Sequence, residues 1–252
     1  MRFLLYNIRY GAGIGRQFHF PFPFSGYLKK TENQLDRIAD FIRGQRPDIV
    51  GLVEVDTGSF RCNGDSQVAT IAGPLCHRQV FRSKYGLDSL AGRLPLLSQQ
   101  ANAVMTNRDI LGRTFHYLNH GMKRLVIEVR LPELTVFLVH LALKYRPRQH
   151  QLLDLAAIVA QAQGPVVVAG DFNVFRGAGE LDGFMAATGL ISANPHGLPS
   201  HPSRSPHRQL DFILHSPALR SLGFQAPQIP YSDHVPLIWD FEALDQDCRV
   251  AA

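Results

Sequence analysis

The sequence predicts an α/β protein that forms a single domain over residues 1–252. Short apolar runs typical of buried strands alternate with segments whose apolar residues recur at helical spacing. Two apolar runs, 125–131 and 134–141, are separated only by Pro132-Glu133. A loop this short cannot carry a crossover, so these strands are expected to be antiparallel. No internal repeat, low-complexity tract or long linker divides the sequence.

Composition sets the class of protein. Of the 252 residues, 45% are hydrophobic and 19% charged, as in soluble globular proteins. No run of about eighteen apolar residues predicts a membrane span. The start of the chain is too short and too soon polar for a signal peptide, which predicts a cytoplasmic protein with no required protein partner evident. Three scattered cysteines favour a reducing compartment.

The charge balance favours an anionic partner. A net charge of +5 and a pI near 9.3 suit nucleic acid, a phospholipid surface or a small phosphoester equally well. Charge alone does not choose among them.

The N-terminal half begins with an expected strand, residues 3–8, which carries Asn7 and is followed by Arg9. A helix is expected from Thr31 to Gln45, because Thr31 and Gln34 form a capping box and apolar residues follow at i, i+3, i+4 and i+7. The next strand, 48–53, ends at Glu54.

Between these elements lies an aromatic segment, Phe18 to Phe24, interrupted by Pro21 and Pro23. The prolines exclude a central strand. We expect the aromatic rings to fold back onto the domain, with contact to a substrate or a membrane surface as the alternative.

Further elements follow the same patterns. Helices are expected at 66–73, 149–163 and 180–188, and strands at 78–82, 101–106, 115–118, 165–170, 209–215 and 235–241. Residues 194–208 are predicted to be a loop. Its three histidines, His196, His201 and His207, are interpreted as solvated, since no helix or hairpin fixes a metal-binding spacing.

The most informative segment is residues 165–173. A buried strand ends there at Gly170 and is followed by Asp171 and Asn173. A carboxylate and a carboxamide at the end of a buried strand need partners, and a metal ion or a phosphate group would supply them. The alternative is a turn in which both side chains bond their own backbone.

Polar residues recur at strand ends throughout the chain. This set comprises Asn7, Glu54, His140, Asp171, Asn173, Asp211, Asp233 and His234. Strand ends on one sheet edge converge, and grouped acids repel one another unless a cation lies among them. Oxygen ligands without cysteine favour Mg²⁺ or Mn²⁺. With histidines that titrate near neutral pH, the set predicts metal-assisted phosphoester hydrolysis.

Six motifs occur in a recognisable order. They are Asn7-Ile8-Arg9, Gly51-Leu52-Val53-Glu54-Val55, Val139-His140-Leu141, Gly170-Asp171-Phe172-Asn173, Leu210-Asp211-Phe212-Ile213 and Ser232-Asp233-His234. Together they resemble the endonuclease/exonuclease/phosphatase (DNase I-like) superfamily. The resemblance implies a four-layer sandwich of two mixed β-sheets packed face to face, with helices on both outer sides.

The resemblance also implies a metal site. Glu54 would be the principal Mg²⁺ (or Mn²⁺) ligand, with Asn7 beside it and Asp233 in or near the site. Each has a structural alternative: Asn7 as a turn residue, Glu54 as a surface acid at a strand end, and Asp233, with Ser232, as a cap or turn.

The catalytic roles follow from the same resemblance. Asp171 and Asn173, with Asn7, would orient the attacking water and contact the phosphoryl group. His234, held by Asp211, would be the general base or a phosphate contact, and His140 would protonate the leaving oxygen or bind the phosphate.

Arginines complete the implied site. Arg9 stands where the DNase I branch has an arginine, and we expect Arg9, Asn173 and Arg148 to bind the substrate phosphate. No acidic partner for His140 is evident, because the segment around residue 84 offers Lys84 and Tyr85.

The leading hypothesis is therefore an Mg²⁺-dependent phosphoester hydrolase. A nuclease acting on DNA or RNA would need a basic track, for which the candidates are Arg9, Lys84, Lys123, Arg124, Lys144 and Arg148. A sphingomyelinase-like phospholipid hydrolase would use the aromatic segment at an interface. A non-catalytic binding module is disfavoured, because all eight polar positions are present.

Overall fold

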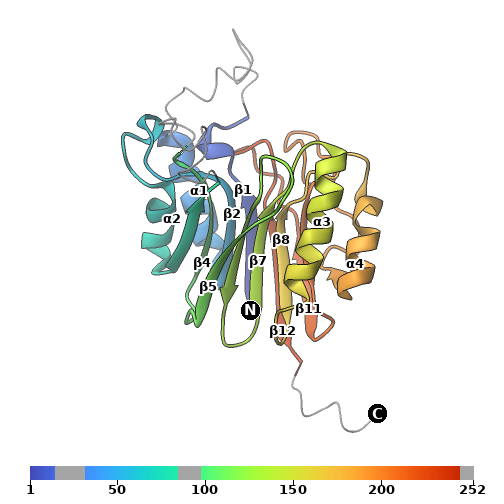
Figure 1. The fold of residues 1–252 in the computed structure, drawn as a ribbon. Helices are drawn as coiled ribbons and strands as arrows, with labels where there is room; N and C mark the ends of the chain where they lie inside the picture. Colours follow the sequence, from blue (N-terminus) through green and yellow to red (C-terminus); the bar gives the residue numbers. More distant parts are fainter. Residues whose placement is uncertain (15–31, 85–97, 245–252) are drawn as a thin grey trace.

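The computed structural model describes residues 1–14, 32–84 and 98–244. The aromatic segment Phe18 to Phe24 and the predicted cap Thr31 lie outside these ranges. Figure 1 shows strands at the centre of the molecule, with helices on both sides.

The first sheet has six strands in the order β11-β12-β1-β2-β4-β3. These strands span Arg2–Asn7 (β1), Ile49–Asp56 (β2), Arg78–Ser83 (β3), Gln100–Thr106 (β4), Leu219–Gln225 (β11) and Leu237–Ala243 (β12). β1 and β2 pair in parallel, and the other neighbours are antiparallel. Helices α1 (Glu32–Gln45) and α2 (Gln67–Leu75) pack on its outer face.

The second sheet has the order β5-β6-β7-β8-β10-β9. Its strands span Gly112–Tyr117 (β5), Leu125–Arg130 (β6), Thr135–His140 (β7), Val166–Asp171 (β8), Ile191–Ser192 (β9) and Asp211–His215 (β10). Only β7 and β8 are parallel, and α3 (Tyr145–Val159) and α4 (Asp182–Thr188) cover the outer face. The 3-10 helices are η1 (Arg9–Gly11), η4 (Phe60–Cys62) and η6 (Ala178–Leu181).

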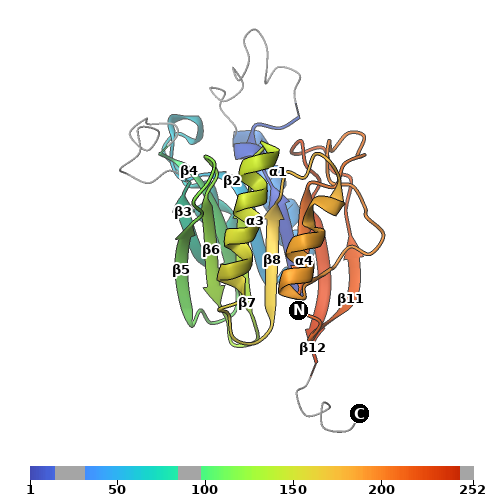
Figure 2. The same cartoon turned by 45° about the vertical axis from the view of Figure 1, so that its right-hand side comes forward.

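Three apolar layers hold the sandwich together. Phe3, Leu138 and Trp239 belong to the layer between the sheets, and each outer layer joins one sheet to its helices. Successive side chains on a strand point to opposite faces, so strands buried on both faces need near-continuous apolar sequence. Burying one such side chain contributes about 1.5–3 kcal/mol. The four-layer sandwich is confirmed (Figures 1 and 2).

Most expected elements form, including the antiparallel pair β6 and β7. β2 differs, because it continues past Glu54 to Asp56 with a register shift between Leu52 and Val55. α3 begins at Tyr145 rather than 149 and ends at Val159. Its Pro147 lies in the first turn, where proline has no backbone hydrogen bond to break.

Two strands were not predicted. β9 has only two residues, and β11 lies at a sheet edge with mostly exposed side chains. Neither carries an apolar pattern that would reveal it.

No helix within the described ranges is both long and apolar enough to cross a membrane.

Candidate active site

The site forms where strands from both sheets end. Asp171 is the register partner of His140 on one side and of Asp211 on the other. Asn7, at the end of β1, donates from Nδ2 to Asp171 Oδ2 over 3.1 Å and so links the two sheets. The predicted convergence of these strand ends is confirmed for these side chains.

Asn173 is held by its own motif. Its backbone N–H donates to Asp171 Oδ1 (3.1 Å), and its Nδ2 donates to the Leu141 carbonyl (3.0 Å). Its φ of 55° lies in the left-handed region, which asparagine tolerates better than most residues. The turn interpretation and the functional one are thus compatible, because the turn places both side chains in the site.

Asp171 is a carboxylate in a crowded, buried place. Burial, and then the neighbouring Asp211, raise the pKa of Asp171 to about 6, against which His234 and Lys123 act. Two carboxylates this close repel each other when both are ionised.

His234 pairs with Asp211. The distance from His234 Nδ1 to Asp211 Oδ2 is 2.6 Å. Burial acts to lower the pKa of His234, but the charge and hydrogen bond of Asp211 outweigh it and raise the pKa to about 10. Ser200 Oγ accepts hydrogen bonds from the N–H groups of Leu210 and Asp211, both at 3.1 Å, which fixes the backbone that carries the Asp211 carboxylate.

The segment before His234 is also fixed. Asp233 Oδ2 lies 3.2 Å from Arg9 Nε, and Ser232 Oγ donates to the Asn7 carbonyl over 2.7 Å. Ser203 Oγ donates to the Ser232 carbonyl (2.5 Å). Arg9 therefore sits at the site, but its ion pair is with Asp233.

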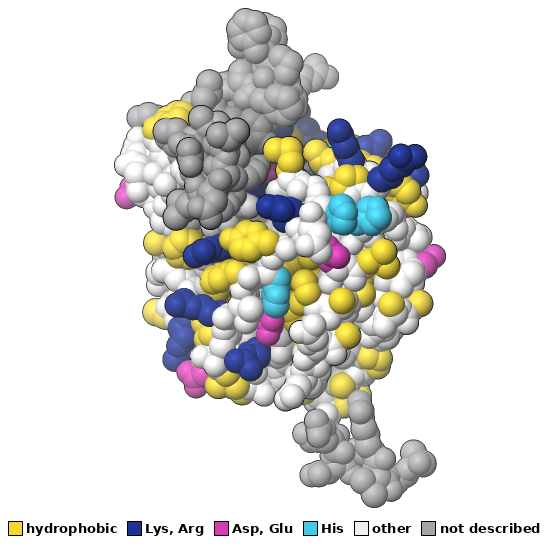
Figure 3. All heavy atoms as spheres, viewed as in Figure 1, with side chains coloured by type: hydrophobic (Ala, Val, Ile, Leu, Met, Phe, Trp, Pro, Cys, Tyr) yellow, Lys and Arg dark blue, Asp and Glu magenta, His cyan; other side chains and the backbone are white. Residues whose placement is uncertain are grey.

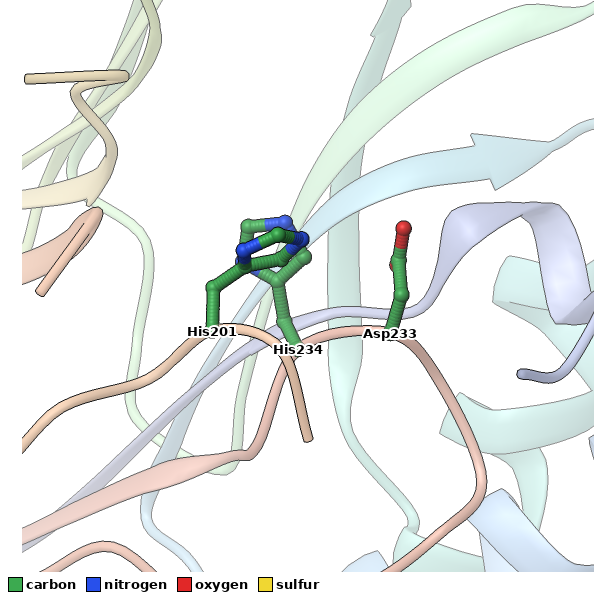
Figure 4. Close-up of side chains that lie close together, drawn as sticks. All are labelled: His201, Asp233 and His234. Atoms are coloured by element: carbon green, nitrogen blue, oxygen red, sulfur yellow. The ribbon is translucent and has the colours of Figure 1, made fainter. Parts of the chain in front are cut away.

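His201 is a site residue that the sequence did not reveal. Figure 4 shows its ring beside that of His234, and the ring centroids are 4.8 Å apart. Burial, and then the charge of His234, lower the pKa of His201 to about 4. The interpretation of His201 as a solvated loop histidine is wrong, because residues 200–203 of that loop bond to the segments that carry Asp211 and His234.

Glu54 lies among cations. Its Oε1 is 3.8 Å from Lys84 Nζ, 3.8 Å from Lys123 Nζ and 3.9 Å from His140 Nε2. Burial acts to raise the pKa of Glu54, but these lysines, with His234 and Arg9, bring it below the ordinary value. The positive φ of Glu54, 58°, coincides with the irregular register in β2, and such strain is typical of functional positions.

His140 lies between two lysines. Lys84 Nζ is 3.2 Å from His140 Nδ1, and Lys123 Nζ contacts His140 Nε2. Burial, Lys123 and Lys84 together hold the pKa of His140 well below its ordinary value. Burial also lowers the pKa of Lys84 to about 7, although Glu54 acts in the other direction. Neither lysine follows an apolar run, so the sequence indicated both only as candidates for a basic track.

The donor set fits a divalent cation. Two groups offer ligand atoms within 4.8 Å of one another: Asp171, Asp211 and His234, and His201, Asp233 and His234. Asp211 Oδ1 is buried without a hydrogen-bond partner among the described residues. A cation would relieve the repulsion between Asp171 and Asp211. His234 is not a ligand while it is an imidazolium, so the donors that fit a cation are the carboxylate oxygens of Asp171, Asp211 and Asp233 and the imidazole of His201.

Arg148 is not brought into this site. Its guanidinium is buried, pairs with Glu180 at 2.6 Å and donates to the carbonyls of Ala142 and Leu143. The phosphate contact expected of Arg148 does not fit this geometry, because its donors already have partners. Lys84 is buried as well, so the six expected basic residues form no continuous exposed track.

The sequence matches the model of the Endonuclease/Exonuclease/phosphatase family over residues 4–234. No curated protein matches the chain.

Solved structures share the fold. An endonuclease/exonuclease/phosphatase family protein from Bacteroides thetaiotaomicron has a TM-score of 0.73 at 14% identity, covering 97% of this chain and 98% of its own. A mannosyl-6-phosphatase from the same species has a TM-score of 0.70 at 14% identity, covering 96% and 99%. The catalytic domain of human Nocturnin has a TM-score of 0.67 at 21% identity, covering 96% and 93%. With the family model spanning nearly all of the chain, this protein belongs to the endonuclease/exonuclease/phosphatase family, a family of phosphoester hydrolases.

Proposed function

We propose that the protein hydrolyses phosphoesters with the help of a divalent cation, Mg²⁺ or Mn²⁺. The observation that carries this proposal is the meeting of Asn7, Asp171 and the Asp211–His234 pair at the ends of strands from both sheets. A structural cluster has no need of buried acids this close together, since each costs free energy when unpaired.

The protein residues have separate tasks. Asp171 and Asn173 orient the attacking water, with Asn7 holding Asp171 through its 3.1 Å hydrogen bond. Asp211 orients His234 through the 2.6 Å contact and raises its pKa to about 10, so that an imidazolium faces the phosphoryl group. Asp233, which belongs to one of the two ligand groups, would hold the cation, with Glu54 and Asn7 as the further ligands that the family resemblance implies. The cation would polarise the phosphoryl oxygens when bound.

Hydrolysis of bis-p-nitrophenyl phosphate and p-nitrophenyl phosphate tests the proposal. Activity is expected with Mg²⁺ or Mn²⁺ and not with EDTA, and Asp171→Ala and His234→Ala should each lower it at least about 10²-fold. Asp40→Ala and His150→Ala are matched controls, because both side chains are exposed. Absence of metal-dependent release by the wild type, or equal release by the site variants, contradicts the proposal.

Nucleic acid is a second candidate substrate, favoured by one surface feature. The Arg176 guanidinium lies 3.9 Å from the centroid of the Tyr145 ring, and that of Arg208 lies 5.8 Å from the Phe175 ring. Both rings are exposed, on segments that follow β7 and β8. Figure 3 shows lysine and arginine side chains gathered at the upper right of the molecule. Alternating aromatic and basic groups suit single-stranded nucleic acid.

Activity on different substrates distinguishes these candidates. A Tyr145→Ala/Phe175→Ala variant should lose activity on single-stranded oligonucleotides and keep activity on p-nitrophenyl esters. Sphingomyelin vesicles test the phospholipid alternative, whose expected contact, Phe18 to Phe24, lies outside the described residues. Equal loss on all substrates would refute a specific role for the two rings.

A further inference from the structure

His140 has an ammonium group at each ring nitrogen. Lys84 Nζ lies 3.2 Å from Nδ1, and Lys123 Nζ contacts Nε2. The imidazole also lies 3.4 Å from Asp171 Oδ2, at the centre of the site. Every direction in which His140 could form a hydrogen bond is therefore taken by a side chain of the protein.

Exposure separates these three residues. The side chain of His140 is 1% exposed and that of Lys84 is 3% exposed, whereas that of Lys123 is 22% exposed. A substrate oxygen approaching this part of the site meets Lys123 before it can meet His140 Nε2, which Lys123 covers.

Lys84 is fixed from several sides. Its Nζ donates to the Tyr10 hydroxyl over 3.1 Å and lies 5.1 Å from the centroid of that ring. It is also 3.8 Å from Glu54 Oε1. A buried ammonium is costly unless it is paired in this way, so Lys84 serves as a fixed support for the imidazole.

Lys123 is supported through its main chain. It lies just before β6, and its carbonyl accepts a 2.6 Å hydrogen bond from Gln151 Nε2, a buried residue of α3. The same Nε2 donates to the His120 carbonyl over 2.7 Å. The backbone at Lys123 is thus held, while its side chain reaches from the surface to His140 and Glu54.

We propose that Lys123 is the group that contacts the phosphoryl or leaving oxygen of the substrate on this side of the site, and that Lys84 and His140 position it. The assignment rests on the phosphoesterase function proposed above. It corrects the role that family resemblance implies for His140, which becomes a positioning residue. Lys123 supplies a positive charge to developing negative charge, and no covalent bond to the protein forms.

Leaving-group dependence provides the test. The test compares phenyl and p-nitrophenyl esters that carry the same phosphoryl group, and it uses inorganic phosphate as an inhibitor. The variants are Lys123→Met, Lys123→Arg and the control Lys144→Met. Lys144 is an exposed lysine at the start of α3. Lys123→Met should lower kcat/KM for the phenyl ester about 10²–10³-fold. The loss should be smaller for the p-nitrophenyl ester, because its leaving oxygen needs less stabilisation.

The other variants and the inhibitor give further expected results. Lys123→Arg should recover part of the loss, because it keeps the charge, and Lys123→Met should weaken inhibition by phosphate. Lys84→Met should show the same leaving-group dependence as Lys123→Met, and the double variant should be no worse than Lys123→Met alone. If Lys84 had only a structural role, Lys84→Met would lower kcat/KM equally for both esters, and its effect would add to that of Lys123→Met.

The outcomes are distinguishable. If the wild type hydrolyses both esters but Lys123→Met matches Lys144→Met, the role of Lys123 is overturned and the phosphoesterase function stands. If the wild type hydrolyses neither, both are overturned. Lys123→Gln, which keeps a polar side chain, carries the same test if Lys123→Met fails to fold.

Discussion

Gly170 offers a direct test of how the chain places Asp171. Its φ is +151°, and a Cβ at this position would lie 1.9 Å from the Val139 carbonyl oxygen and 2.8 Å from its carbon. Carbon and oxygen atoms of neighbouring strands normally approach to about 3.3–3.6 Å. A methyl group therefore cannot be accommodated unless β8 moves away from β7.

The expected cost of Gly170→Ala follows from that movement. Backbone strain contributes about 1–3 kcal/mol, and one or two weakened ladder hydrogen bonds contribute about 0.5–1.5 kcal/mol each. The sum is on the order of 3 kcal/mol, which lowers the Tm of a chain this long by roughly 6–12 °C. Because Val139 pairs with Gly170 and His140 with Asp171, the displacement reaches the site directly.

Urea unfolding and thermal melting measure the effect. Gly183→Ala is the matched control, since no atom lies within 4 Å of its added Cβ and alanine favours the helix α4. We expect the control to be as stable as the wild type or slightly more stable. If the free energy of unfolding of Gly170→Ala lies within about 1 kcal/mol of the wild-type value, the strand packing inferred here is wrong.

Three further predictions concern single side chains. Asp211→Asn should lower kcat about 10–100-fold and bring the pKa of His234 down from about 10, measured by kinetics and NMR titration; an unchanged histidine pKa would contradict the pairing. Burial lowers the pKa of His215 from 6.5, so the unfolded chain binds the proton more readily and the free energy of unfolding should fall as the pH drops below about 6.5. His215→Phe should lose this part of the pH dependence when urea unfolding is compared at pH 7 and pH 5. The same change in unfolding free energy between the two pH values for variant and wild type would contradict this prediction. Arg148→Met should destabilise the fold by about 3–5 kcal/mol, because it leaves Glu180 buried and unpaired, and it should not change inhibition by phosphate. Weaker inhibition by phosphate with unchanged stability would instead indicate that Arg148 binds the substrate phosphate.

The sequence predicted which side chains at strand ends would lie close together. A buried strand is recognisable from its apolar run, and a polar residue at its end must be functional, capped or paired. Asn7, Asp171 and Asp211 satisfy this rule. The register of β8 and β10 places Asp211 beside Asp171, and the packing of the two sheets brings Asn7 to Asp171. Glu54 departs from it in detail, because β2 continues through this residue with an irregular register.

Residues that reach the site from loops were not predictable in this way. Lys84 follows β3 and Lys123 precedes β6, and neither position has a pattern that tells a surface lysine from a buried one. His201 is similar, since the loop conformation that brings it to His234 depends on Ser200 and Ser203. Tertiary hydrogen bonds, rather than local periodicity, place these side chains.

Arg148 shows the converse error. It was expected to bind the substrate phosphate, as one of the basic residues around the cleft. α3 begins earlier than predicted, which places Arg148 in a first turn whose buried face also includes Gln151 and Leu152. A shift in a helix start thus converts an apparent surface cation into a core residue.

The support beneath Lys84 carries a last prediction. Arg61 and Asp56 are both fully buried, and Arg61 Nη2 lies 2.6 Å from Asp56 Oδ2. The Arg61 guanidinium lies 4.7 Å from the centroid of the Tyr10 ring, whose hydroxyl accepts from Lys84. Asp56 Oδ1 also accepts from the Ser59 N–H over 2.7 Å, so the pair fixes its own loop.

Removing one partner leaves the other charge buried, which costs about 3–5 kcal/mol, whereas removing both avoids an uncompensated charge. Arg61→Met and Asp56→Asn should each destabilise by that amount, and the double variant by at least about 1 kcal/mol less than their sum. Asp56→Asn keeps the Oδ1 acceptor for the Ser59 N–H but loses Oδ2 as the acceptor for Ser59 Oγ and Arg61. Single variants whose effects simply add would show that the pair is not coupled, and that Tyr10 and Lys84 are held without it.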